Sequence, residues 1–176
     1  MSTSQRSATS FGEAAADAPA DALVLVEGQG SLCHPGSTAT LPLLRGSQPT
    51  DLLLVHRAGQ TTIRHHPAIS LPPLGDLIAS LEALAALGRP AGGGEADRLP
   101  RVVAIALNTA HLEEKEAALA ITSVAEATGL PCDDPVRHGG RALLEALGGP
   151  DLGHQGRSTV TEAQGLRASE GIRTPE

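Results

Sequence analysis

The sequence predicts an α/β fold in which a partial parallel sheet carries helices on both faces. Short, continuous apolar runs at residues 23–26, 52–56 and 102–107 are typical of strands that are buried on both sides. Amphipathic stretches alternate with these runs, and the clearest of them span residues 74–87 and 113–128. Such alternation implies right-handed crossovers, which bring the loops that follow the strands to one edge of the sheet. We therefore expect a ligand to bind at that edge.

The first half of the chain is expected to contain two strands with a short helix between them. The apolar run Leu23–Val26 is predicted as the first strand. A short helix is expected at Ser37–Leu44, and Pro42 limits it because proline lacks the N–H group that a helix interior requires. A second strand is expected at Leu52–His56, and residues 57–73, which contain three prolines, are expected to form a loop.

The second half begins with a helix and the strongest strand of the chain. Large apolar side chains three or four residues apart predict a helix over residues 74–87, which Gly88 and Pro90 end. The run Val102–Leu107 predicts a strand, because every residue in it is apolar. A second amphipathic helix is expected over residues 113–128.

Short elements are expected to close the domain. Gly129 suits the end of the preceding helix, because glycine adopts a left-handed backbone without steric penalty. A short strand is expected over residues 130–133, and a helix over residues 139–147. Residues 89–100 contain three consecutive glycines and are expected to form a flexible surface insertion.

The pattern indicates one ordered domain with a tail at each end. Residues 21–148 carry all the periodic segments and have the size of a typical domain. Residues 1–20 and residues 149–176 have few large apolar side chains and no amphipathic stripe. Both tails are therefore expected to be disordered.

Composition excludes several classes of partner. The net charge is −7 and the isoelectric point is about 5.4, which argues against nucleic acid or an anionic membrane. Phe11 is the only aromatic residue, so no stacking platform for single-stranded nucleic acid is expected. Cys33 and Cys132 form neither a CxxC motif nor a disulfide framework. No apolar signal region or membrane-spanning run is present, so we expect a cytoplasmic protein with free thiols.

Polar residues directly follow the first predicted strand. Glu27 precedes Gly28-Gln29-Gly30, and closely spaced glycines let a backbone approach a ligand. We interpret Glu27 as a general base or as an acidic group near a phosphate-bound magnesium ion, with a solvated carboxylate as the alternative. Ser31 and His34 could act as nucleophile and base, although a serine more often satisfies a turn and His34 could simply shape its loop.

A second polar pair follows the strongest strand. Asn108 and Thr109 come directly after the run that ends at Leu107. In a nucleotide site such an asparagine can hydrogen-bond a base edge. Asparagine and threonine also cap helices well, and the local sequence favours neither interpretation over the other.

A third polar group surrounds Pro135 near the last predicted strand. Arg137 could bind a phosphate or a carboxylate through its planar guanidinium, and an internal ion pair with an aspartate is the alternative. The neighbouring polar residues are Asp133, Asp134 and His138. Histidines elsewhere in the chain lack the spacing of metal ligands, so no metal site is expected.

Several segments, taken in order, resemble the C-terminal domain of the DgcN-like family. The family includes D-glutamate N-acetyltransferase, and the resemblance covers about residues 21–148. The segments that carry it are Val26-Glu27-Gly28-Gln29-Gly30-Ser31-Leu32, His34-Pro35, Gly46-Ser47-Gln48-Pro49, Ala106-Leu107-Asn108-Thr109, and Gly129-Leu130-Pro131 through Asp134-Pro135-Val136-Arg137.

The resemblance implies a fold, a reaction and roles for individual residues. The C-terminal domain of the family is similar to dethiobiotin synthetase, which implies a three-layer, P-loop NTPase-like fold. It implies acetyl transfer from acetyl-CoA to the amine of D-glutamate, in the catabolism of D-amino acids. Glu27 or His34 would be the base, Asn108 would read an adenine, and Arg137 would clamp a substrate carboxylate. ATP with magnesium is a further ligand that the fold similarity suggests.

The chain departs from the family in one motif. Family members carry an N-terminal domain and a Walker-type glycine loop ahead of this segment, whereas no GxxxxGK[ST] occurs here. We therefore expect a fragment or a truncated member, missing the first strand and helix of its sheet and inactive by itself. The exposed sheet edge would take a partner chain or a second copy. The alternatives are a non-catalytic binding or assembly module and one half of an ATP-dependent ligase-like or kinase-like enzyme.

Overall fold

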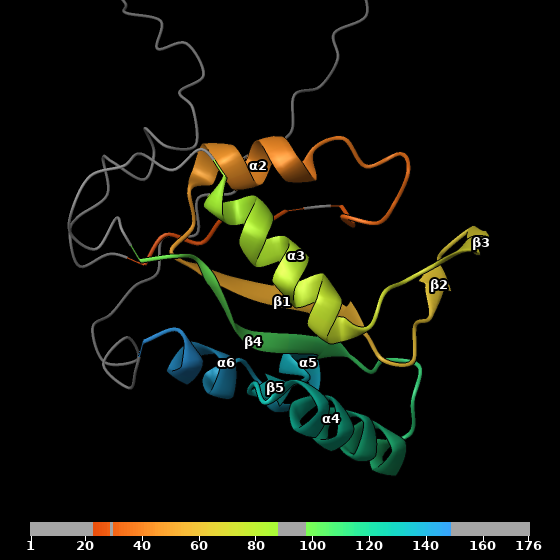
Figure 1. Ribbon diagram of the computed structural model, residues 1–176. Coiled ribbons are helices and arrows are strands. Elements are labelled where there is room, and N and C mark those ends of the chain that lie inside the picture. The colour runs from red at the N-terminus through yellow and green to blue at the C-terminus, as the bar shows by residue number, and fades with distance from the viewer. Residues whose placement is uncertain (1–22, 29, 88–97, 149–176) are drawn as a thin grey trace, which may run out of the picture.

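A three-stranded parallel sheet forms the centre of the molecule (Figure 1). The computed structural model describes residues 23–28, 30–87 and 98–148. The strand order is β1–β4–β5, with β1 at Asp51–Arg57, β4 at Arg101–Asn108 and β5 at Cys132–Asp133. The predicted strands at 52–56, 102–107 and 130–133 are thus present, with slightly different bounds.

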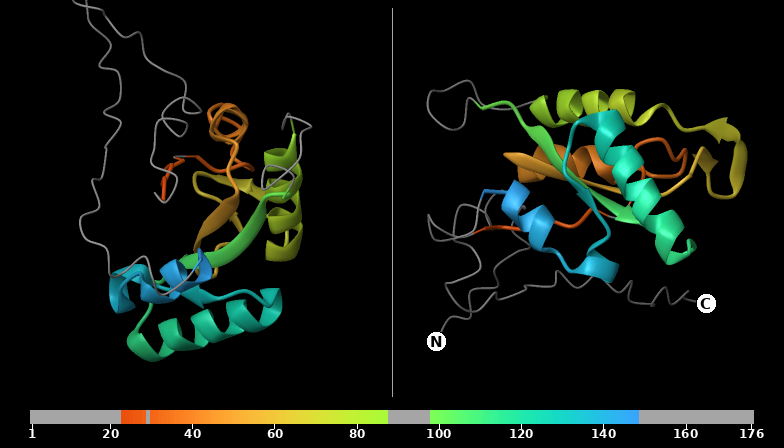
Figure 2. Two further views of the ribbon diagram at one scale, coloured as in Figure 1. Left: turned by 90° about the vertical axis from the view of Figure 1, so that its left-hand side faces the viewer. Right: turned by 90° about the horizontal axis from the view of Figure 1, so that it is seen from below.

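Helices cover both faces of this sheet, as the sequence predicts. The helices are α2 (Thr40–Ser47), α3 (Leu74–Ala86), α4 (Glu114–Thr128), α5 (Pro135–His138) and α6 (Arg141–Ala146). Helix α3 lies on one side of the strands, and α4 and α6 lie on the other (Figures 1 and 2). Helix α2 packs against α3 rather than across the sheet. The molecule is therefore an α/β structure with three layers.

Strand β4 supplies the core on both faces, and a bulge determines which of its residues share a face. Leu52 of β1 lies opposite Val102, but Leu53 lies opposite Ala104, so one residue of β4 has no partner. An extra residue reverses the alternation of side chains along a strand. Val102 and Ile105 consequently share one face and pack with Leu77 of α3. On the opposite face, β4 packs against α6, where its small side chains Ala104 and Ala106 contact Leu143.

The ends of α4 follow from local chemistry. The Glu116 carboxylate accepts a hydrogen bond from the N–H of Glu113 at 3.3 Å, which satisfies a donor that the first turn leaves free. Gly129 ends the helix with a φ of 69°. This left-handed conformation is costly for other residues, so the predicted role of Gly129 is confirmed.

The predicted strand at Leu23–Val26 is wrong. Residues 23–28 form no regular element, and Leu25 is 72% exposed. A parallel strand persists only where its backbone groups pair with a neighbour, and no strand within the described residues pairs with this segment. Farther along the loop, Leu32 and Cys33 pack against the core instead.

Two further segments differ from the sequence-based expectation. The expected loop at 57–73 contains an antiparallel hairpin of β2 (Thr62–Ile63) and β3 (His66–Ser70), which His65 allows by adopting a φ of 66°. The first helix begins at Thr40, which puts Pro42 in its first turn, where no helical N–H is needed.

The predicted closing helix at 139–147 is present as α6, and a short additional helix, α5, precedes it. Gly139 adopts a φ of 78° between them, and this conformation interrupts a right-handed helix. The expected disorder of residues 1–20 and 149–176, and most of the expected insertion at 89–100, lies outside the described residues. None of the helices that the structure describes is long and apolar enough to cross a membrane.

Candidate functional site

The ends of the parallel strands meet at one edge, as the crossovers predict. Arg57 ends β1 opposite Asn108 of β4, and the N–H of Ala58 donates to the carbonyl oxygen of Asn108 at 3.1 Å. Asp133 of β5 lies opposite Ala106 of β4. The loop after β4 and the helix after β5 are therefore neighbours at this edge, where an α/β sheet usually binds its ligand.

A buried hydrogen-bond cluster joins the end of β4 to the start of α5. Thr109 is fully buried and Asp134 is 2% exposed. The backbone N–H of Thr109 donates to Asp134 Oδ2 at 3.0 Å, and the Thr109 hydroxyl donates to the same oxygen. The other carboxylate oxygen of Asp134 accepts from the N–H groups of Val136 and Arg137. Asp134 thus caps α5 and anchors it to β4.

The charge of Asp134 is stabilised despite its burial. Burial favours the neutral carboxylic acid and raises the pKa. The hydrogen bonds from the Thr109 hydroxyl, from the Thr109 backbone and from the first turn of α5 act in the opposite direction. They outweigh burial, so the pKa of Asp134 lies below its usual value. The cluster therefore contains a buried, ionised carboxylate at neutral pH.

Most of the N–H groups of the Arg137 side chain donate hydrogen bonds to the loop after β4. Its Nε donates to the Thr109 hydroxyl at 2.8 Å, and its Nη1 donates to Glu114 Oε2 at 2.9 Å. Its Nη2 donates to the carbonyl oxygens of Thr109 and Leu112 at 3.1 and 2.6 Å. Four of the five N–H groups of the guanidinium are thus engaged within the protein. This geometry favours the internal role over the predicted clamp on a substrate carboxylate.

Asn108 has an amide donor without a partner in the described part of the chain. Its Oδ1 accepts a hydrogen bond from the N–H of Ala110 at 3.0 Å, which closes a turn at the end of β4. The residue is exposed, and its Nδ2 has no partner among the residues that the structure describes. Asn108 therefore both shapes the loop and presents an amide donor at the sheet edge.

An aspartate–histidine pair lies beside this cluster. His138 Nδ1 is 2.6 Å from Asp133 Oδ1, and the same oxygen accepts from the N–H of Asp134 at 2.8 Å. The hydrogen bond to Asp133 raises the pKa of His138, and the negative charges of Asp133, Glu114 and Asp134 add to the effect. With its Nδ1 proton directed at Asp133, neutral His138 can accept a proton at Nε2, which has no partner among the described residues.

Sequence reasoning grouped His138 with its polar neighbours but did not select it as a site residue. The available signal was an aspartate at the end of a strand and a histidine one short helix later. The spacing becomes meaningful only when Asp134 caps α5, because that turn brings His138 back over Asp133.

The loop that contains Gly28, Gly30, Ser31 and His34 lies apart from this cluster and makes its own contacts. The Ser31 hydroxyl accepts from the N–H of Cys33, and His34 Nδ1 accepts from the N–H of Gly36 at 3.0 Å. No hydrogen bond within the described residues joins Ser31 to His34 through their side chains. His34 instead packs edge-on against His66 of β3, with 5.1 Å between the ring centres.

Packing explains the two described glycines of this loop. A Cβ on Gly28 would lie 2.7 Å from the Leu43 side chain, and one on Gly30 would lie 2.3 Å from the Ser37 hydroxyl. A side chain at either position would therefore require the Leu43 or the Ser37 side chain to move, whether or not a ligand binds. Glu27 is exposed, and Gln29 lies outside the described residues. None of the residues that the structure describes forms a cluster of three or more metal-binding side chains.

Comparison with known proteins identifies the class of domain. Residues 8–144 match a family model described as the DUF1611 domain of unknown function, a C-terminal P-loop domain. The chain therefore belongs to the DUF1611 family, and its partial parallel sheet is a P-loop NTPase-like fold. The predicted relationship to the C-terminal domain of the DgcN-like family is confirmed.

Two curated relatives and one solved structure are similar to this chain. D-glutamate N-acetyltransferases of Tritonibacter scottomollicae and a Pseudoalteromonas species are 39% and 33% identical to it over 124 residues. Each alignment covers 70% of this chain and 35% of the relative, so the chain spans about a third of their length. The crystal structure of a DUF1611 family protein from Anabaena variabilis is 55% identical with a TM-score of 0.62. It is matched over 69% of this chain and 34% of that one.

Proposed function

We propose that this chain forms the C-terminal part of an N-acetyltransferase that moves the acetyl group of acetyl-CoA to the amine of D-glutamate. Such a reaction would serve the catabolism of D-amino acids. The observation that carries the proposal is that two relatives with this activity in their names align with it over 124 residues. The polar groups at the sheet edge support acyl-transfer chemistry of this kind.

The reaction needs a base and a donor to the oxyanion. The amine must lose a proton as its nitrogen bonds to the thioester carbon, and the CoA thiolate leaves when the tetrahedral intermediate collapses. His138 suits the base, because Asp133 holds its Nδ1 and leaves Nε2 free. The Nδ2 group of Asn108 suits a donor to the oxyanion.

The two bases expected from the sequence have less suitable surroundings. Neutral His34 carries its proton on Nε2, because its Nδ1 accepts from the N–H of Gly36. This tautomer favours hydrogen-bond donation over proton acceptance. Glu27 lies in an exposed segment without regular structure, and its side chain has no hydrogen-bond partner among the residues that the structure describes.

ATP and magnesium fit these residues poorly. A Walker-type cradle needs a glycine loop and a lysine, but the sequence has no GxxxxGK[ST] motif and its single lysine is Lys115. Lys115 lies on the exposed surface of α4. These residues therefore offer no phosphate-binding loop for a nucleotide.

A chimera tests the proposal directly. The 124-residue segment of the Tritonibacter relative would be replaced by its counterpart from this chain. Release of free CoA from acetyl-CoA would then be measured with D-glutamate, and with L-glutamate as the control. We expect turnover with D-glutamate, and we expect His138→Gln to lower kcat by at least about 100-fold.

Two matched variants separate the candidate bases. Glu27→Gln and His34→Gln in the same chimera should retain most of the activity if His138 is the base. A folded chimera without acetyl transfer would count against the acetyltransferase proposal.

The open edge of β1 supports a second candidate, a non-catalytic assembly module. Within the described residues β1 pairs with β4 alone, so its other edge has unpaired backbone groups. This candidate predicts stable association with a partner chain but no turnover by any chimera.

A further inference from the structure

A hollow lies at the carboxyl end of β1. None of the site residues expected from the sequence lines it. Three separate segments form it: the end of β1 and its turn (residues 57–60), the hairpin residues Thr62 and Arg64, and His111 after β4. Its volume is about 440 Å³. The pairing of Arg57 with Asn108 puts the hollow next to the end of β4.

The lining of this hollow is cationic in an acidic protein. Arg57 and Arg64 both line it, and no acidic residue does, whereas the whole chain has a net charge of −7. Both arginines are exposed, and within the described part of the chain neither forms an ion pair. In contrast, Arg98 and Arg101 each pair with a carboxylate. Two arginines that line one hollow, and that form no ion pair within the described residues, attract an anion and have donors left to bind it.

We propose that this hollow binds a small oxyanion, a carboxylate or a phosphate group, through the guanidiniums of Arg57 and Arg64. The planar fork of arginine matches the two oxygens that both groups present. His111 lines the same hollow. This site does not depend on the acetyltransferase proposal, because an anion would be held whatever reaction the family member performs.

The test is a titration of the full chain with two probes, inorganic phosphate and glutarate. The backbone amide signals of Gly59 and Gln60, which line the hollow, would be followed by NMR. We expect at least one probe to shift these signals, and we expect Arg57→Ala and Arg64→Ala each to weaken its binding about tenfold. Tighter binding of phosphate would indicate a phosphorylated ligand, and tighter binding of glutarate a carboxylate ligand.

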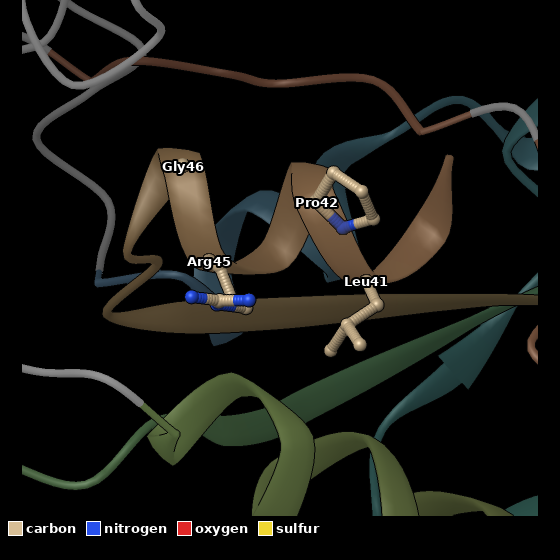
Figure 3. Close-up of a pocket in the computed structure, with 4 residues that line it drawn as sticks. All are labelled: Leu41, Pro42, Arg45 and Gly46. Atoms are coloured by element: carbon tan, nitrogen blue, oxygen red, sulfur yellow. The ribbon is translucent and has the colours of Figure 1, made fainter. Parts of the chain in front are cut away.

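Arg45→Ala is the matched control. Arg45 is an exposed arginine that lines a different hollow on α2 with Leu41, Pro42 and Gly46 (Figure 3). Its removal lowers the net charge equally and should leave the affinity unchanged. Arg57→Lys, which keeps the charge but not the fork, should weaken binding less than Arg57→Ala.

Three outcomes would overturn the proposal. The first is that neither probe shifts the signals of Gly59 and Gln60 in the unmodified chain. Alternatively, both alanine variants, with amide spectra that show an intact fold, could bind as tightly as the parent. Finally, Arg45→Ala could weaken binding as much as they do, which would indicate a response to net charge alone.

Discussion

At the scale of single residues, the contact between Asp133 and His138 predicts a change in the pKa of His138. The carboxylate raises the pKa of the imidazole through the hydrogen bond at Nδ1. Asp133→Asn removes the charge and should lower the pKa of His138 towards its usual value of 6.5. An NMR titration of the His138 ring proton measures this shift directly, without any assay of activity.

The same contact has a consequence for stability with a definite sign. A raised pKa in the folded chain means that the pair stabilises the fold below pH 6.5, where His138 is charged in both states. This contribution is lost as the pH rises through the raised pKa. Glu145→Gln, which removes an exposed carboxylate of α6, is the control and should leave the titration of His138 in place. An unchanged pKa in Asp133→Asn would show that the contact does not form in solution.

Burial also shifts the pKa values of two other residues on the strands, Cys132 and His56. It raises the pKa of Cys132 to about 11, with a further increase from the charge of Asp133. Cys132 is therefore a protonated packing residue at neutral pH rather than a nucleophile. Burial lowers the pKa of His56 on β1, so this imidazole remains neutral where His138 is charged. The sheet edge thus contains one histidine with a lowered pKa, His56, and one with a raised pKa, His138.

At the scale of elements, Asp134 is the link between β4 and α5. Asp134→Asn keeps the shape of the side chain but replaces one charged acceptor by a donor that faces the Thr109 N–H. We expect a loss of about 2 kcal/mol in the free energy of unfolding, because a buried donor loses its partner. Urea unfolding at neutral pH measures this loss. Asp76→Asn, in the exposed first turn of α3, should change stability little.

The pH dependence of this link can be predicted from the lowered pKa of Asp134. Its hydrogen bonds stabilise the fold at pH values above its usual pKa of 3.8, and this contribution is lost as the pH falls through the lowered value. Parent and Asp134→Asn should therefore approach each other in stability in strong acid. A constant difference between them down to that pH would contradict the assignment of an ionised Asp134.

Periodicity predicted the longer elements because each buries a continuous face. Helices α3 and α4 and strand β4 follow directly from the spacing of their apolar residues. The run at Leu23–Val26 has the same composition as a buried strand, but a strand also needs a neighbour, and composition does not reveal one. The hairpin in residues 57–73 depends on a left-handed His65, which propensity does not favour.

The candidate site shows the same division between what local sequence reveals and what the fold adds. Asn108 and Thr109 could be placed at the sheet edge because they follow an unmistakable strand. The predicted alternative for Arg137, an internal ion pair, is present with Asp134, but its backbone acceptors could not be predicted, because the carbonyls of Thr109 and Leu112 are more than twenty residues away. The pairing of Asp133 with His138 likewise depends on how Asp134 starts α5.

For the whole molecule, the open edge of β1 is the feature with the largest consequence. Strand β1 pairs with β4 alone among the described strands, and Val55 on it is 72% exposed. Unpaired strand edges next to exposed apolar side chains template association with another strand. We therefore expect the isolated chain to self-associate as its concentration rises, which sedimentation equilibrium measures.

A charge on this strand should oppose such association. Val55→Lys places a cation beside the edge, and burying it against a second copy would cost enough to weaken self-association about tenfold. Leu119→Lys is the control, since Leu119 on α4 is 71% exposed and lies on a different element. An equal effect of both variants would indicate nonspecific apolar association. A parent chain that stays monomeric at every concentration would show that the edge of β1 is protected in solution.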